Sequence, residues 1–382
     1  MDRPFETIEE MLATLRPREP VYCIYPGAYR RGARRFLQGF PGRVLYAVKA
    51  NDHPSVLRLL HEAGVDAFDC ASVTEIALVR QHCPAATPFF MSPARLRGAA
   101  EEAFHEHGVR HFLVDDPTGL RQLLMEIDPA ESVIFARMVA RHDSAMMDFS
   151  GKFGAAPKAI PDLLSEIAGM GAEPALAFNV GSSVTSPEAY ARSLALAAGQ
   201  LAGLPFKVRL LDIGGGFPLP YPGFEVPPLE AFFETIAALR DEIPLADGGQ
   251  LLAEPGRALA APGLSAVVEV LLRKDERLYI NDGMFGIFWE LRFKGHKRYA
   301  SRVFRNGREH HAEAADFHLF GPTCDGSDAL PEPFQLPADI APGDHIEFGR
   351  IGAYSLAGRT HFNGFYSDTV VSITGEEPPG AP

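Results

Sequence analysis

The sequence predicts a closed (β/α)8 barrel followed by a domain made mostly of β-strands. Up to about residue 263, short apolar runs alternate with helical patterns, which is typical of a parallel sheet. Three segments, 60–69, 104–114 and 167–178, repeat the order helix, glycine, apolar strand. A doubly wound open sheet is the alternative, but eight parallel strands match a barrel. We expect these strands at about residues 44–48, 66–69, 87–91, 110–115, 132–138, 174–180, 207–213 and 250–254.

The pattern changes after about residue 263, where short β runs are separated by Gly and Pro turns. We therefore predict two domains, a barrel at 24–263 and a β domain at 264–382, with residues 1–23 contributing to the second. The tail from 374 to 382 is rich in Pro, Gly and Glu, so we expect it to be disordered. The predicted β runs are 267–270, 277–280, 345–348 and 369–372, with a further strand at 21–25.

Composition excludes several classes of protein. The net charge of −13 argues against nucleic acid as a partner, because binding to phosphates needs a basic face. There is no apolar run of the roughly 18 residues that a membrane helix needs, and the start lacks the pattern of a signal peptide. The cysteines show no zinc spacing, so we expect reduced thiols, a cytoplasmic protein and no metal. They are Cys23, Cys70, Cys83 and Cys324.

Lys49 directly follows the apolar run 44–48. An amine at the inner end of a buried strand is costly to hold charged, and desolvation makes it a better nucleophile. The usual use of such an amine is a Schiff base with an aldehyde, and the commonest aldehyde cofactor is pyridoxal 5'-phosphate. The alternative is a lysine that extends along the surface to reach water.

Polar residues recur at the ends of the predicted strands, where barrels of this kind carry their chemistry. Each could simply cap a loop, but together they outline one polar site. Consecutive glycines can present backbone N–H groups to a phosphate. A carboxylate beside a pyridine nitrogen keeps that nitrogen protonated and makes the ring a stronger electron sink. The strand-end residues are Lys49, Asp69, Arg137, Asn179, Ser182, Gly214, Gly215, Gly216, Glu254 and Arg257.

Six stretches of sequence identify a family resemblance. They are YAVKAN at 46–51, FDCAS at 68–72 with Glu75, LDIGGGFP at 211–218, AEPGR at 253–257, GPTCDG at 321–326, and GAY at 352–354 with FNGF at 362–365. With these, the chain resembles the fold-type III pyridoxal phosphate-dependent decarboxylases, the ornithine, diaminopimelate and arginine decarboxylase group that shares the alanine racemase barrel. The segment with Cys324 and Asp325 is most similar to the ornithine decarboxylase branch.

The resemblance implies a role for each matching residue. Lys49 would bind the cofactor aldehyde, and Glu254 would pair with its ring nitrogen. Cys324 would return a proton to the α-carbon after CO2 leaves, and Asp325 would face the distal amine of the substrate. Both would reach the other subunit's site, which implies a head-to-tail homodimer with two shared sites. Asp69, Glu75 and Arg137 would line the cofactor pocket, while Ser182, Gly214, Gly215, Gly216, Arg257 and Tyr354 would hold the phosphate.

The implied reaction is decarboxylation of an ornithine- or lysine-type amino acid to a diamine, as in polyamine biosynthesis. Two departures from the family leave alternatives open. Asn179 stands where the family has a histidine that stacks on the cofactor, and Lys294 stands where ornithine decarboxylases have an aspartate. A lysine would repel an ammonium, so either Glu290 supplies the carboxylate or the substrate carries a distal carboxylate or acylated amine.

Three further substrates or functions remain possible. Arginine is one, and a racemase or a carrier of the cofactor on the same barrel is another. A non-catalytic homologue that acts as a binding partner is the third. The presence of both Lys49 and Cys324 favours a decarboxylase.

Overall fold

The computed structural model describes residues 3–148, 150–292 and 299–381. The chain forms two compact units. The first, here called the barrel unit, contains Ala33–Leu219 and Val226–Gly256. The second, here called the β unit, contains Met1–Gly32, Pro220–Glu225 and Arg257–Pro382. Among the described residues, no helix is long and apolar enough to cross a membrane.

Eight parallel strands close the barrel in the order β11-β12-β3-β4-β5-β6-β7-β9, with β9 paired to β11. The predicted fold is confirmed, and the open-sheet alternative is wrong. Inside the barrel, Leu45, Phe89, Leu113 and Phe135 pack as a buried core, since alternate residues of each strand face inward. The strands are β3 (Arg43–Ala47), β4 (Ala67–Cys70), β5 (Thr87–Phe90), β6 (His111–Val114), β7 (Val133–Val139), β9 (Glu173–Asn179), β11 (Leu210–Asp212) and β12 (Gln250–Ala253).

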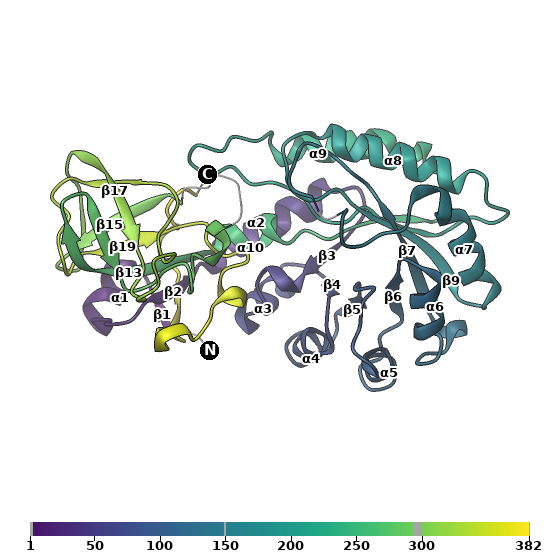
Figure 1. Cartoon of the computed structure of the whole chain (residues 1–382), viewed down its shortest axis with the longest axis horizontal. Helices are drawn as coiled ribbons and strands as arrows, with labels where there is room; N and C mark the ends of the chain where they lie inside the picture. The colour runs from purple at the N-terminus through teal and green to yellow at the C-terminus, as the bar shows by residue number, and fades with distance from the viewer. Residues whose placement is uncertain (1–2, 149, 293–298, 382) are drawn as a thin grey trace. The chain divides into compact units, whose positions relative to one another are not determined.

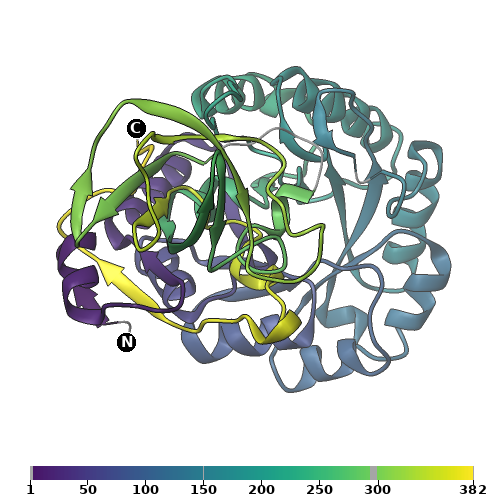
Figure 2. The ribbon, with the colours of Figure 1, turned by 60° about the vertical axis from the view of Figure 1, so that its left-hand side comes forward.

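Helices lie outside the barrel strands (Figures 1 and 2). Their starts follow from local capping: the Ser72 side chain accepts from Glu75 N, and the Asp116 side chain accepts from Thr118 N and Gly119 N. A short antiparallel pair, β8 (Ala145–Met147) and β10 (Ser182–Val184), lies off the barrel. The helices are α3 (Pro54–Glu62), α4 (Val73–His82), α5 (Ala99–His105), α6 (Pro117–Leu123), α7 (Ile160–Gly169), α8 (Glu188–Leu201) and α9 (Leu229–Leu239), while α2 (Pro26–Gly39) begins in the β unit and ends in the barrel unit.

The β unit is a mixed sheet. Its main path is β1-β20-β2-β13-β14-β17-β18, and β13 also pairs with β19, which continues through β15 to β16. The expected strand at 21–25 is present as β2, which pairs antiparallel with β13 and parallel with β20. The elements are β1 (Arg3–Phe5), α1 (Ile8–Leu15), β2 (Val21–Ile24), α10 (Arg257–Ala260), β13 (Leu264–Lys274), β14 (Arg277–Ile280), β15 (Ser301–Arg305), β16 (Arg308–His310), β17 (Ala314–Phe320), β18 (Phe334–Pro337), β19 (His345–Phe348) and β20 (Val370–Ile373).

The tail that we expected to be disordered is held to the β unit, so this prediction is wrong for residues 374–377. Thr374 N donates to Phe5 O at 2.9 Å. Glu376 accepts from Ile8 N at 2.7 Å and pairs with Arg302 at 3.0 Å. The composition of the tail suggested disorder. The Glu376 carboxylate nevertheless holds the tail in place, because it binds the N-terminus of α1 and Arg302.

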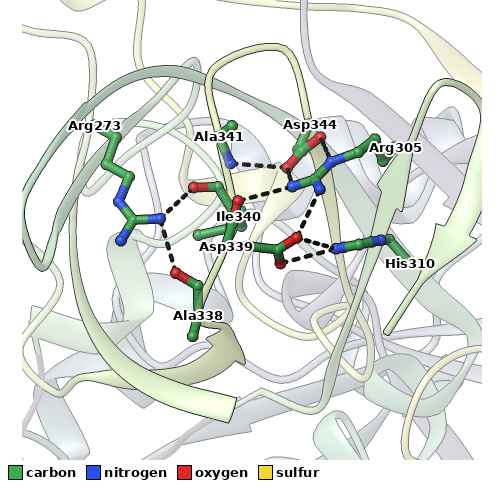
Figure 3. Close-up of polar contacts among 8 residues, drawn as sticks. All are labelled: Arg273, Arg305, His310, Ala338, Asp339, Ile340, Ala341 and Asp344. Carbon is green, nitrogen blue, oxygen red and sulfur yellow. Dashed lines mark hydrogen bonds and ion pairs between the residues drawn. The ribbon is translucent and has the colours of Figure 1, made fainter. Parts of the chain in front are cut away.

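A polar cluster fixes the turn that precedes β19 (Figure 3). Arg305 pairs with Asp344 and Asp339, each at 2.8 Å, and His310 lies 2.9 Å from Asp339. Arg273 donates to two backbone carbonyls of the same turn. Because these contacts join β13, β15 and β16 to one turn, they hold β19 in register between its two neighbours.

Asp282→Asn should flatten the pH dependence of unfolding of the β unit between about pH 4 and 6. Asp282 is buried and accepts from Tyr22 OH at 2.8 Å. Burial raises its pKa to about 6, whereas an unfolded aspartate titrates near 3.9. The stabilisation from the bound proton is therefore lost as the pH rises through this window, at up to about 1.4 kcal/mol per pH unit.

Asparagine can still accept from the amides of Gly283 and Ile287, which bond Asp282 Oδ1. Urea unfolding at a series of pH values measures the change in slope. An unchanged slope would assign the titration to another group.

Candidate active site

Lys49 follows the barrel strand β3. The strand ends at Ala47, and Val48–Ala50 form a single turn of 3-10 helix. Lys49 Nζ lies 3.1 Å from Asp69 Oδ2, and 48% of the Lys49 side chain is exposed. We expected a buried, desolvated amine, and this is not observed because the turn carries Lys49 beyond the strand. Its charge is stabilised instead by the buried Asp69 carboxylate.

Asp69, Asp212 and Glu254 form an acidic group beside Lys49. Burial raises the pKa of Asp212 to about 6. Burial, followed by the negative charges of Asp212 and Asp69, raises the pKa of Glu254 well above its ordinary value. The Asp212 and Glu254 side chains share a hydrogen bond. Glu254 is therefore the group that holds a proton, and a base brought against it could take that proton.

The loop Gly214–Gly216 follows β11 and can be built only from glycine. A Cβ atom on each residue in turn would lie 2.6, 2.6 and 2.8 Å from the backbone carbonyl oxygens of Phe178, Glu254 and Gly181. The carbonyls of the loop are turned toward the protein, and Gly214 N donates to Asp212 Oδ1 at 2.8 Å. The amides of Gly215 and Gly216 are therefore the ones that suit contact with a ligand. These carbonyls accept from Glu254 N, Tyr190 OH and Val184 N.

Asn179 ends β9 and shapes the next turn. Its Oδ1 accepts from Gly181 N at 2.9 Å, and Gly181 has a left-handed φ of 98°. This is a turn closed by an asparagine side chain, so the residue has a backbone-capping contact. Contact of Asn179 with the cofactor ring stays a prediction. Ser182 is half-buried and pairs with Met147 across β10 and β8.

Glu75 and Arg137 belong to the barrel unit as expected. Glu75 accepts from Ala71 N at 2.6 Å at the start of α4, and burial raises its pKa to about 7. Arg137 lies near the end of β7, with its guanidinium carbon 5.8 Å from the centre of the Phe153 ring. Their place in a cofactor pocket stays a prediction.

Arg257 lies in the β unit and is paired with Glu290. Both side chains are buried, 5% and 6% exposed. Arg257 Nη1 donates to Glu290 Oε2 at 3.0 Å, and Nη2 donates to Oε1. The Arg257 guanidinium carbon also lies 5.1 Å from the centre of the Tyr354 ring. We predicted Glu290 as a substrate ligand, and that role stays a prediction, since its buried carboxylate is paired with Arg257. Lys294 lies outside the described residues.

Cys324 and Asp325 lie on an exposed loop of the β unit. Cys324 Sγ is 3.4 Å from Asn363 Oδ1, which also accepts from Cys324 N at 3.3 Å. Asp325 accepts from the amide and hydroxyl of Ser327, and these hydrogen bonds lower its pKa. The loop is anchored by buried Asp328, whose carboxylate accepts from Met284 N at 2.7 Å and from Thr323 Oγ1 at 2.7 Å.

The barrel unit thus brings together Lys49, Asp69 and Glu254. Asp212 and Asn363 are two further site residues for which we expected no role from the sequence. Asp212 could have been found because it is the one charged residue of the apolar run 210–213, which three glycines follow. Asn363 lies in the FNGF stretch at 362–365 that supports the family resemblance, but only the folded chain shows that it contacts Cys324.

Comparisons with known proteins agree with this geometry. The family model described as pyridoxal-dependent decarboxylase, pyridoxal binding domain, matches residues 27–261. Antizyme inhibitor 2 of Xenopus laevis is 31% identical, over 96% of this chain and 83% of its own. The lysine/ornithine decarboxylase of Selenomonas ruminantium is 31% identical, over 85% and 81%. The structure of Paramecium bursaria Chlorella virus arginine decarboxylase bound to agmatine has a TM-score of 0.85 at 26% identity, covering 96% of this chain and 99% of that one.

The fold and site define a barrel enzyme that works with pyridoxal phosphate. The chain belongs to the pyridoxal-dependent decarboxylase family and is an amino-acid decarboxylase. The residues present fit the cofactor: a lysine amine at a strand end, a proton-bearing glutamate and a glycine loop whose carbonyls face away.

Proposed function

We propose that the chain decarboxylates an ornithine- or lysine-type amino acid to a diamine. The observation that carries the proposal is the anchored loop that exposes Cys324 and Asp325. When bound, pyridoxal phosphate withdraws the electron pair left at the α-carbon as CO2 departs. Cys324 Sγ then returns a proton to that carbon, and the ionised Asp325 binds the distal ammonium.

In this proposal the barrel residues bind and orient the cofactor. Lys49 holds its aldehyde covalently, and Glu254 gives its proton to the ring nitrogen and pairs with it. Asp69, Glu75, Arg137 and Asn179 line the pocket. The phosphate contacts are Ser182, Gly214–Gly216, Arg257 and Tyr354.

We also propose a head-to-tail homodimer, in which Cys324 and Asp325 of one subunit complete the site of the other. The support is the family resemblance of the GPTCDG stretch at 321–326. A cytoplasmic location likewise stays a prediction.

The experiment is product analysis by mass spectrometry. The purified protein, loaded with pyridoxal phosphate, is incubated separately with L-ornithine, L-lysine, L-arginine and acylated forms of the first two. We expect putrescine or cadaverine as the main product, and borohydride should fix the cofactor to Lys49. Agmatine as the main product, or an adduct on another lysine, would contradict the proposal.

A substrate with a modified far end is the second candidate, and Lys294 is the observation that favours it. A lysine facing a free ammonium at about 4 Å would repel it by roughly 4 kcal/mol at an effective dielectric near 20. Lys294→Asp in the same panel separates the cases. If the natural substrate lacks a distal ammonium, wild type should turn over ornithine poorly and the variant should do so better.

A binding protein without activity is the candidate from another class. The similarity to antizyme inhibitor 2 favours it, and the presence of Lys49 and Cys324 opposes it. A protein that binds the cofactor but releases no CO2 from any amino acid of the panel would support this alternative.

A further inference from the structure

Ser183 has a backbone conformation that suits glycine better than serine. It is the central residue of β10 and has a φ of 50°. For a residue with a Cβ, the left-handed region carries a steric cost that glycine avoids.

The Ser183 side chain is also buried without a hydrogen-bond partner. It is 2% exposed, and within the part of the chain that the structure describes its Oγ has no partner. A hydroxyl removed from water with nothing to bond is destabilising, and such groups are commonly completed by a ligand or a water. The buried, unbonded hydroxyl therefore indicates a missing partner, at a position where the backbone would favour glycine.

The neighbours of Ser183 contact the glycine loop. Val184 N donates to Gly216 O at 2.9 Å, and a Cβ on Gly216 would lie 2.8 Å from Gly181 O. Ser182 precedes it directly. In a regular strand, successive side chains point to opposite faces, but the left-handed φ of Ser183 breaks that alternation. The alternation rule therefore does not place the Ser183 hydroxyl on the face opposite to Ser182.

We infer that Ser183 Oγ donates a hydrogen bond to the phosphate group of pyridoxal phosphate. A hydroxyl suits this place because it donates to an anion without adding charge. The inference rests on the proposed phosphate site at Ser182 and Gly214–Gly216. It adds a side-chain donor that the resemblance did not suggest.

The test compares the binding of two cofactor forms to the apo-protein. Pyridoxal phosphate and pyridoxal, which lacks the phosphate, are titrated by absorbance and fluorescence. Ser183→Ala and Ser183→Gly should each weaken pyridoxal phosphate binding about tenfold and leave pyridoxal binding unchanged. Glycine relaxes the backbone whereas alanine does not, so a loss common to both reports on the hydroxyl. If the alanine variant does not fold, the glycine variant still decides.

Ser193→Ala is the matched control. Ser193 is buried on α8, and its hydroxyl donates to Ala189 O at 2.9 Å. It should bind both cofactor forms like wild type. The inference is overturned if Ser183→Gly binds pyridoxal phosphate with wild-type affinity, which is the result expected if the hydroxyl bonds a water molecule and not the phosphate. It is also overturned if the variant loses affinity for both cofactor forms equally. A wild type that binds no pyridoxal phosphate would overturn the cofactor site as a whole.

Discussion

Mixing equal amounts of the Lys49→Ala and Cys324→Ala proteins should restore decarboxylase activity that neither has alone. Lys49 belongs to the barrel unit and Cys324 to the β unit. In the proposed dimer each site takes one of them from each subunit. Random pairing makes half of the dimers mixed, each with one intact site of two, so recovery should approach about a quarter of wild-type activity. Release of CO2 from L-ornithine and L-lysine measures it.

The control is a mixture of two barrel variants, Lys49→Ala and Asp69→Asn. Both residues lie in the barrel unit, so no pairing creates an intact site. That mixture should show only the sum of its two parent activities. Differently tagged chains confirm that subunits exchange. If exchange is complete and Lys49→Ala with Cys324→Ala recovers nothing, the site is not shared in the way proposed.

The barrel could be predicted because each of its strands is a short apolar run between helical patterns. The strand expected at 132–138, for example, is β7 at Val133–Val139. The β unit was harder to predict because its strands have solvent-facing sides. Ala314–Phe320 alternates exposed and buried residues, and Arg308–His310 is entirely polar. Such strands do not stand out from polar loops in the sequence.

The sequence predicted individual candidate site residues, but it did not predict which of them contact each other. Arg257 and Glu290 are 33 residues apart, and Cys324 and Asn363 are 39 apart. Contacts over such separations are made by the fold and leave no local pattern. The prediction that Lys49 is buried was wrong because of a one-residue error in the end of the strand. The strand was expected to reach residue 48 but ends at Ala47, and one residue suffices to turn a side chain.

Glu290→Gln should destabilise the β unit by about 3–5 kcal/mol, because it removes one partner of a buried ion pair. Both side chains are almost fully buried, and both carboxylate oxygens bond the guanidinium. Burial alone would lower the pKa of Arg257, but the negative charge of Glu290 raises this pKa well above its ordinary value. The variant therefore leaves a charge that cannot be released. Urea unfolding of the apo-protein, followed by tryptophan fluorescence, measures the loss.

Two controls identify the source of this loss. Glu309→Gln removes a carboxylate 3.9 Å from Arg302 that is 35% exposed, and it should cost about 1 kcal/mol or less. The double variant Arg257→Met with Glu290→Leu removes both charges and should recover most of the stability. A Glu290→Gln protein as stable as wild type would contradict a buried pair.

The same variant tests whether Arg257 reaches the phosphate. If it does, pyridoxal phosphate supplies the negative charge that glutamine lacks, so the cofactor should raise the urea midpoint of Glu290→Gln more than that of wild type. Pyridoxal, which carries no phosphate, should raise both midpoints equally. If the phosphate gives the variant no extra stabilisation, Arg257 serves only to hold Glu290, and the phosphate must then be bound by the glycine loop and its neighbouring hydroxyls alone.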